Sequence, residues 1–110
     1  MVVTYFFMGK KRCETCTNLE KLTKQTVAKF RDRGVRYRFV DCDDETNKHY
    51  IEELKLESKS VVVSVFKDGQ RADWSVLDMG EAFMLVAESK DKQFDDYLSA
   101  EINNMLGGGK

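Results

Sequence analysis

Apolar residues form runs that predict the strands of a buried sheet. Residues 2–8 are almost continuously apolar, the pattern of a central strand that is covered on both faces. Residues 35–42 alternate large apolar side chains with arginine, and residues 60–66 are rich in valine, so both predict strands. The Asp-Gly pair within residues 67–70 predicts a hairpin turn, after which residues 71–77 return as the antiparallel partner.

Helical spacing of apolar residues follows the strands. Residues 14–33 predict a long helix, with Gly34 as its C-terminal stop, and residues 43–56 predict a second helix that opens with Asp and Thr cap candidates. A short helix near 80–88 and a longer one near 90–106 complete the chain. The expected order is β-α-β-α-β-β-α with an extra short helix before the last one, a three-layer α/β sandwich.

Composition adds few constraints to this pattern. The chain has 110 residues, of which 42% are hydrophobic and 34% charged, as in soluble single-domain proteins. We expect one domain over residues 1–106 and a flexible tail over 107–110. No apolar run reaches the length of a membrane span, and the run at 2–8 has neither the basic start nor the cleavage site of a signal peptide. As given, the chain is expected in the cytoplasm, and outside it if a native export signal is missing here.

Charge is distributed unevenly along the chain. Residues 1–40 hold ten Lys and Arg against three Asp and Glu, a net charge of +7. Residues 41–110 hold eight against sixteen, a net charge of −8. These halves sum to −1, which favours attraction within one fold. The basic residues alternate with apolar ones and do not cluster with exposed aromatics, so we expect no nucleic-acid partner. A monomer is expected.

The strongest chemical signal is a Cys-x-x-Cys motif. Cys13 and Cys16 stand at the predicted junction between the first strand and the first helix. There, unpaired backbone N–H groups and the helix dipole favour a thiolate on Cys13. Arg12 and Lys11 add positive potential, while Glu14 opposes it, and we expect a Cys13 pKa below the ordinary value of about 8.5.

Position also assigns the second cysteine a role. Cys16 lies one turn later on the same helical face, where it can attack a mixed disulfide on Cys13. Two other interpretations stay open: a metal site that adds Cys42 and His49, and inert thiols. We expect His49 on a helix surface, Cys42 as a small buried residue, and no metal. Cys42 could also serve as a third thiol if it lies at the same edge of the sheet.

The predicted order of elements, with Cys-x-x-Cys between the first strand and the first helix, resembles the thioredoxin fold over nearly the whole chain. "YFFMGKKRCETCTNLEKLTKQ" with "SVVVSVFKDGQ" is similar to a small bacterial thioredoxin-like family labelled as a nitrophenyl-compound nitroreductase subunit. The resemblance implies a redox-active centre in which Cys13 attacks and Cys16 resolves. The chain carries no flavin or nicotinamide motif, so we expect no cofactor.

Three positions depart from the thioredoxin pattern. Val61 stands where that family has a cis-proline facing the Cys-x-x-Cys, so Ser60 and Val61 are expected to face the cysteines. A cis bond before valine costs about 3–4 kcal/mol, which predicts a trans Ser60–Val61 bond. Phe7 occupies the place of the buried acid, and Arg12 that of the usual tryptophan.

Two functions from different classes follow. The first is a thiol-disulfide oxidoreductase that exchanges a dithiol and a disulfide with a partner protein. The second is a non-enzymatic thioredoxin-like module that binds a partner or a metal, as the missing cis-proline at Val61 and the missing buried acid at Phe7 suggest. Trp74, Tyr97 and the apolar stripe of the last helix are expected to form core or to cover the sheet, with a partner surface as the alternative.

Overall fold

The sheet is built around strand β1 (Val2–Met8), in which all seven residues are buried. The computed structural model describes residues 1–8, 14–54 and 60–108. Strand β2 (Val35–Asp41) pairs with β1 in parallel, and strand β3 (Ser60–Lys67) pairs with it antiparallel on the other side. Strand β4 (Gln70–Val76) is antiparallel to β3, which gives the order β2-β1-β3-β4.

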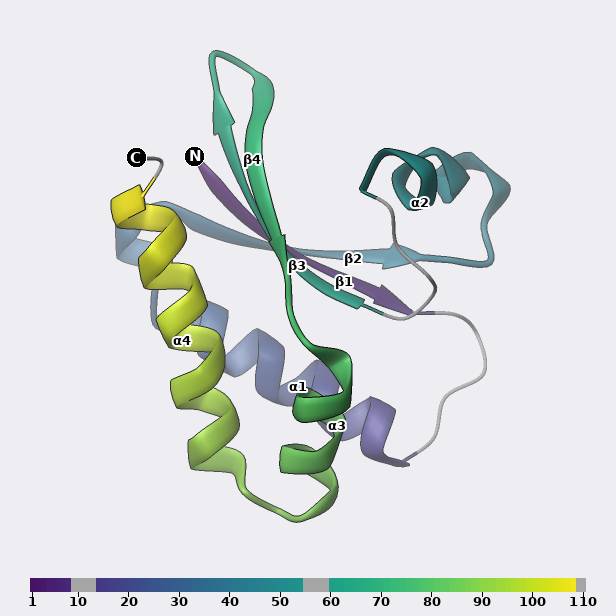
Figure 1. Cartoon of the computed structure of the whole chain (residues 1–110), viewed down its shortest axis with the longest axis vertical. Coiled ribbons are helices and arrows are strands. Elements are labelled where there is room, and N and C mark those ends of the chain that lie inside the picture. Colours follow the sequence, from purple (N-terminus) through teal and green to yellow (C-terminus); the bar gives the residue numbers. More distant parts are fainter. Residues whose placement is uncertain (9–13, 55–59, 109–110) are drawn as a thin grey trace.

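Helices cover the two faces of the sheet unequally (Figure 1). Helices α1 (Glu14–Ala28), α3 (Met79–Ala87) and α4 (Asp91–Gly108) lie on one face, called here the first face. The short helix α2 (Lys48–Leu54) lies on the opposite, second face. A mixed four-stranded sheet in this order, with β3 antiparallel to the rest and helices on both faces, is the thioredoxin-like α/β fold, as predicted.

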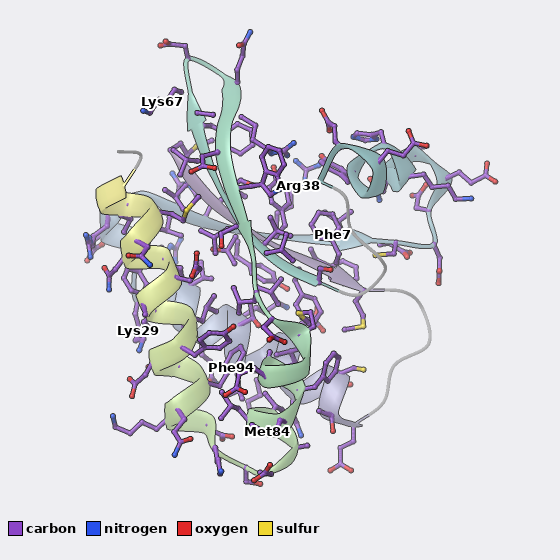
Figure 2. The ribbon with its side chains drawn as sticks, in the orientation of Figure 1. Phe7, Lys29, Arg38, Lys67, Met84 and Phe94 are labelled. Atoms are coloured by element: carbon purple, nitrogen blue, oxygen red, sulfur yellow. The ribbon has the colours of Figure 1, made fainter. Side chains whose placement is uncertain are left out.

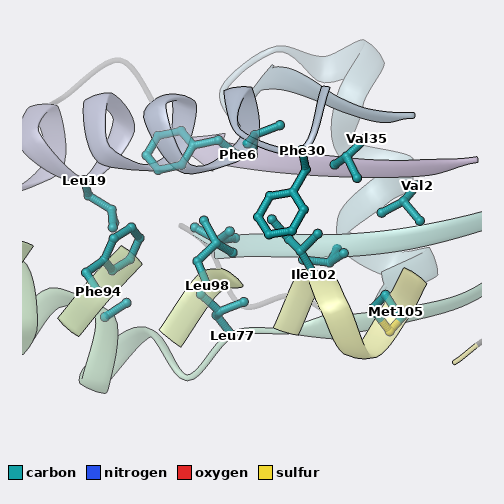
Figure 3. Close-up of a cluster of buried hydrophobic side chains, with 14 of the residues drawn as sticks. Val2, Phe6, Leu19, Phe30, Val35, Leu77, Phe94, Leu98, Ile102 and Met105 are labelled. Atoms are coloured by element: carbon teal, nitrogen blue, oxygen red, sulfur yellow. The ribbon is translucent and has the colours of Figure 1, made fainter. Parts of the chain in front are cut away.

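The larger core lies between the first face and its three helices (Figure 3). Phe6 of β1 and Leu19 of α1 meet Phe94 and Leu98 of α4, and all four side chains are fully buried. The apolar stripe of α4 therefore forms core, as expected. Tyr97 also packs against this cluster, and its hydroxyl accepts the Asp78 backbone N–H at 3.2 Å.

The smaller core lies on the second face. It consists of five buried residues and three partly buried ones, which are Val3, Tyr5, Phe7, Val40 and Val62 with Cys42, Tyr50 and Phe66. Tyr50 of α2 lies 5.8 Å from Tyr5 and 5.7 Å from Phe7, measured between ring centroids. The strand alternation of β1 thus divides its side chains between two cores.

Two turns take the conformations that their residues allow. Gly34 ends the turn before β2 with φ 84°, a left-handed conformation in which glycine has no steric penalty. In the β3–β4 hairpin, Asp68 and Gly69 have φ 54° and 79°, the two positive values of a type I′ turn. The predicted hairpin is confirmed, whereas Gly34 ends the 3-10 turn Arg31–Arg33 and not, as predicted, the first helix.

Four expectations differ from the structure. In place of the start of the helix predicted over 43–56 there is a 3-10 turn (Glu45–Asn47), and α2 begins only at Lys48. The helix predicted over 14–33 ends at Ala28, and a separate 3-10 turn (Arg31–Arg33) follows, because Phe30 turns inward to the larger core. The helix predicted near 90–106 runs from Asp91 to Gly108. Trp74 is 40% exposed on the edge strand β4, so its placement in the core or as cover was wrong.

No helix within the described ranges has the length and apolar content needed to cross a bilayer.

Helices α1 and α4 are joined by a polar contact at the side of the larger core. Asp95 accepts a hydrogen bond from the Thr26 hydroxyl at 2.7 Å and forms an ion pair with Lys29. Burial alone would raise the pKa of the Asp95 carboxyl, but the hydrogen bonds from Lys29 and Thr26 and the nearby lysine charges lower it. The contact also joins the basic first part of the chain to the acidic second part.

We predict that Asp95→Ala lowers the free energy of unfolding by about 1–2 kcal/mol at pH 7, because Thr26 loses its acceptor. A carboxyl whose pKa is depressed in the folded state stabilises the fold above its unfolded pKa of about 4, and this contribution disappears as pH falls. Urea unfolding at pH 7 and pH 3 should therefore show a smaller effect at pH 3.

Asp96→Ala is the matched control, since Asp96 is the next residue on α4 and pairs with Lys92 on the exposed surface. Asp96→Ala should lower the free energy of unfolding by less than about 0.5 kcal/mol. Equal losses at the two positions, or a pH-independent effect at Asp95, would contradict the assignment.

Candidate functional site

The carboxyl end of β1 brings together three segments that are distant in sequence. Met8 ends β1, and its carbonyl accepts the backbone N–H of Cys42 at 3.0 Å, just after β2 ends. Because β3 runs antiparallel to β1, it begins at this same edge, with Ser60 opposite Phe7. The edge therefore gathers the end of two strands and the start of a third, as the strand order predicted.

Cys16 lies in the first turn of α1 and faces the larger core. Its side chain is 1% exposed, in the same cluster as Met8, Leu19 and Val61. Val61 is the second residue of β3, so this cluster includes side chains from the end of β1, the start of α1 and the start of β3. Cys16 is thus a buried thiol at the carboxyl edge of β1.

Three predicted site residues, Lys11, Arg12 and Cys13, lie outside the described residues. In sequence, Cys13 directly precedes Glu14, the first residue of α1. Their roles stay predictions.

Ser60 and Val61 are both buried at the start of β3. Val61 is opposite Phe6 on β1, and its carbonyl accepts the Leu77 backbone N–H at 2.9 Å. No peptide bond between described residues is cis, so the trans Ser60–Val61 bond is confirmed. Val61 shares the Cys16 cluster, and the chain that leads into α3 is held against it by the Leu77 contact.

Phe7, at the position of the buried acid of thioredoxins, points to the opposite side of the sheet from Cys16. It belongs to the smaller core, where its ring lies 5.7 Å from that of Tyr5 (Figure 2). An aromatic hydrocarbon ring can neither give nor take a proton. Phe7 therefore supplies packing to the second face and no acid-base chemistry.

Cys42 lies on the same side as Phe7. It is half-buried and packs against the smaller core, whereas Cys16 belongs to the larger core. Burial raises the pKa of the Cys42 thiol, and the carboxylates of Asp43 and Asp41 raise it further. Cys42 shares the edge but not the face of Cys16, and its surroundings favour the neutral thiol.

The metal interpretation finds no support among the described residues. Within residues 1–8, 14–54 and 60–108, no three His, Cys, Asp or Glu side chains are placed to hold a metal ion. His49 is exposed, with Nδ1 2.8 Å from the Thr46 carbonyl and its ring 4.1 Å from that of Tyr50. The prediction of a surface histidine is confirmed.

Arg71 is a residue that the sequence did not single out. Its guanidinium carbon lies 5.7 Å from the Tyr5 ring centroid, 5.9 Å from Tyr50 and 5.2 Å from Phe66. Its Nη1 is 3.5 Å from Glu53 Oε2, and its side chain is only 14% exposed. The alternation of side chains along β4 could have placed Arg71 on the second face. The sequence could not predict its aromatic neighbours, because the three rings come from three separate elements.

No family model matches this chain, and no curated protein matches it. Membership in the family labelled as a nitroreductase subunit therefore stays an expectation from resemblance.

Two solved structures are similar in part. A structure described as a malarial protein has a TM-score of 0.49 and 14% sequence identity, over 81% of this chain and 96% of its own. Thioredoxin O2 from Arabidopsis thaliana, in its oxidised state, has a TM-score of 0.48 and 18% identity, over 80% of this chain and 74% of its own.

We predict that Cys42 is alkylated slowly at neutral pH. In the variant Cys13→Ala/Cys16→Ala, the midpoint of iodoacetamide reactivity against pH should lie above that of the same chain in urea, because a raised pKa leaves less thiolate. Asp43→Asn should move the native midpoint to lower pH, since one of the two neighbouring carboxylates is removed.

Asp32→Asn, an exposed change on the 3-10 turn before β2, removes the same charge away from Cys42 and should leave the midpoint in place. A native midpoint at or below that of the unfolded chain would show that the carboxylates and burial do not control this thiol.

Proposed function

We propose that the protein is a thiol-disulfide oxidoreductase in which Cys13 attacks and Cys16 resolves. The observation that carries the proposal is the place of Cys16: a buried thiol in the first turn of α1, at the carboxyl edge of β1, in a thioredoxin-like sheet. The residue three positions earlier in the sequence is a second cysteine. Helix starts favour thiolates, so this spacing suits disulfide exchange.

The proposed reaction consists of two exchanges. The Cys13 thiolate attacks one sulfur of a partner disulfide, which forms a Cys13–partner bond and releases the other partner sulfur as a thiolate. Cys16 then loses its proton, and its sulfur attacks the Cys13 sulfur of the mixed disulfide. A Cys13–Cys16 disulfide forms, the partner leaves as a dithiol, and two electrons pass to it. The reverse sequence oxidises a partner dithiol.

Burial supports the assignment of Cys16 as the resolving thiol. A side chain that is 1% exposed is poorly accessible to a disulfide on another protein. It can meet a partner only after that partner is linked to a cysteine beside it. We assign that attacking role to Cys13, with Arg12 and Lys11 lowering the pKa of the Cys13 thiol by their positive charge.

Val61 is proposed to border the partner-binding side of the pair, whereas Ser60, opposite Phe7, lies at the same edge but on the second face of the sheet. Val61 packs in the cluster that contains Cys16, and its carbonyl already accepts a hydrogen bond from the Leu77 backbone N–H. A partner backbone at this edge therefore competes with an existing hydrogen bond. We infer a narrower choice of partner than a general disulfide reductase has.

The test is a trapping experiment with oxidised glutathione as the probe. Cys16→Ala should accumulate a glutathione disulfide on Cys13, because nothing resolves it, while the wild-type chain releases glutathione and forms Cys13–Cys16. Peptide mapping by mass spectrometry locates the adduct. Alanine suits the apolar cluster, whereas serine would bury a hydroxyl at a cost of about 1–3 kcal/mol.

Cys13→Ala is the matched control and should form no adduct at position 16, given the burial of that thiol. No adduct on Cys13, or an equal yield on Cys42, would overturn the proposal. The first of these results would support a module that binds partners without exchange chemistry.

A further inference from the structure

The second face of the sheet contains a groove that α2 does not fill. The groove has a volume of about 700 Å³, within the range of roughly 300–1,000 Å³ that small-molecule sites occupy. Its lining includes Val3 and Tyr5 of β1, Arg36 and Arg38 of β2, Phe66 of β3, and Asp68 of the hairpin. It lies toward the hairpin end of the sheet, and Cys16 is on the other face.

Strand register explains why arginines and apolar side chains meet there. Val3 is opposite Arg36 on β2 and Ser64 on β3, and Tyr5 is opposite Arg38 and Val62. Residues that are directly opposite share a face of the sheet, so each arginine stands beside an apolar row. Two residues along a strand are about 6.6 Å apart, which lets both guanidinium groups reach one small ligand.

The two β2 arginines are not used by the fold. Both are exposed, and no ion pair joins either of them to another residue within the described ranges. Arg71, in contrast, is held among three aromatic rings and beside Glu53. Figure 2 shows Arg38 on the α2 side of the sheet. The lining contains the acidic side chain of Asp68 and the basic side chains of Arg36 and Arg38, so the groove has a net positive charge.

We propose that this groove binds a small carboxylic acid with an apolar body. Arg36 and Arg38 would hold the carboxylate through charge-assisted hydrogen bonds, for which the guanidinium fork is well shaped. The apolar body would lie over Val3 and Phe66, where burial of apolar surface contributes about 25 cal/mol per Å². The site is separate from the cysteine edge and does not depend on disulfide exchange.

The probe pair is 2-naphthoate and 2-naphthamide, which have nearly the same shape and differ in charge. Titration of each into the whole chain, followed by ¹H–¹⁵N spectra, should give at least tenfold tighter binding of naphthoate. The amide shifts should concentrate at residues 3–5, 36–38 and 66–69. Equal affinity for the two probes, no binding up to millimolar concentration, or shifts confined to α1 and α4 would overturn the proposal.

Arg36→Gln/Arg38→Gln should abolish the preference for naphthoate. Lys21→Gln/Lys92→Gln is the matched control: it removes two positive charges from exposed positions on α1 and α4, on the first face, and should keep the preference. Naphthoate binding by the arginine variant at wild-type affinity would also overturn the proposal. The comparison of the two probes on wild-type protein decides the question even if a variant does not fold.

Discussion

The burial of β1 on both faces is the constraint on which the rest of the structure depends. Its side chains alternate between two cores, with Phe6 and Met8 on the first face and Tyr5 and Phe7 on the second. Each face must therefore be covered, because apolar side chains of this size are stable only when removed from water. Helices α1, α3 and α4 lie on the first face, whereas the short helix α2 lies on the second.

The two cores give Cys16 and Cys42 different chemical surroundings. Cys16 lies in an apolar cluster at the start of α1, and Cys42 lies across the sheet beside two carboxylates that disfavour its thiolate. The sheet itself keeps the two side chains in different layers. For this reason we expect Cys42 to take no part in the proposed exchange. The second face also contains the groove beside Arg36 and Arg38.

Much of the fold could be predicted from local patterns, since each strand and the hairpin has a strong local signal. The central strand is almost continuous in apolar residues, and Asp68-Gly69 is one of the residue pairs that favour the two positive φ values of this turn. The site edge followed from the rule that parallel strands end together. What failed depended on tertiary packing: Phe30 shortens the first helix, and Trp74 is exposed because β4 is an edge strand.

The faces that Cys16 and Cys42 occupy depend on strand register and on the direction of α1, which the sequence pattern does not contain. The most direct test of the Cys13–Cys16 pair is a dithiothreitol redox titration of the wild-type chain, with thiol labelling and mass mapping of all three cysteines. Thiol-disulfide exchange by this pair predicts one reversible two-electron transition of Cys13 and Cys16 together, with Cys42 a thiol throughout. A pair that never changes state, or a disulfide between Cys42 and Cys16, would contradict it.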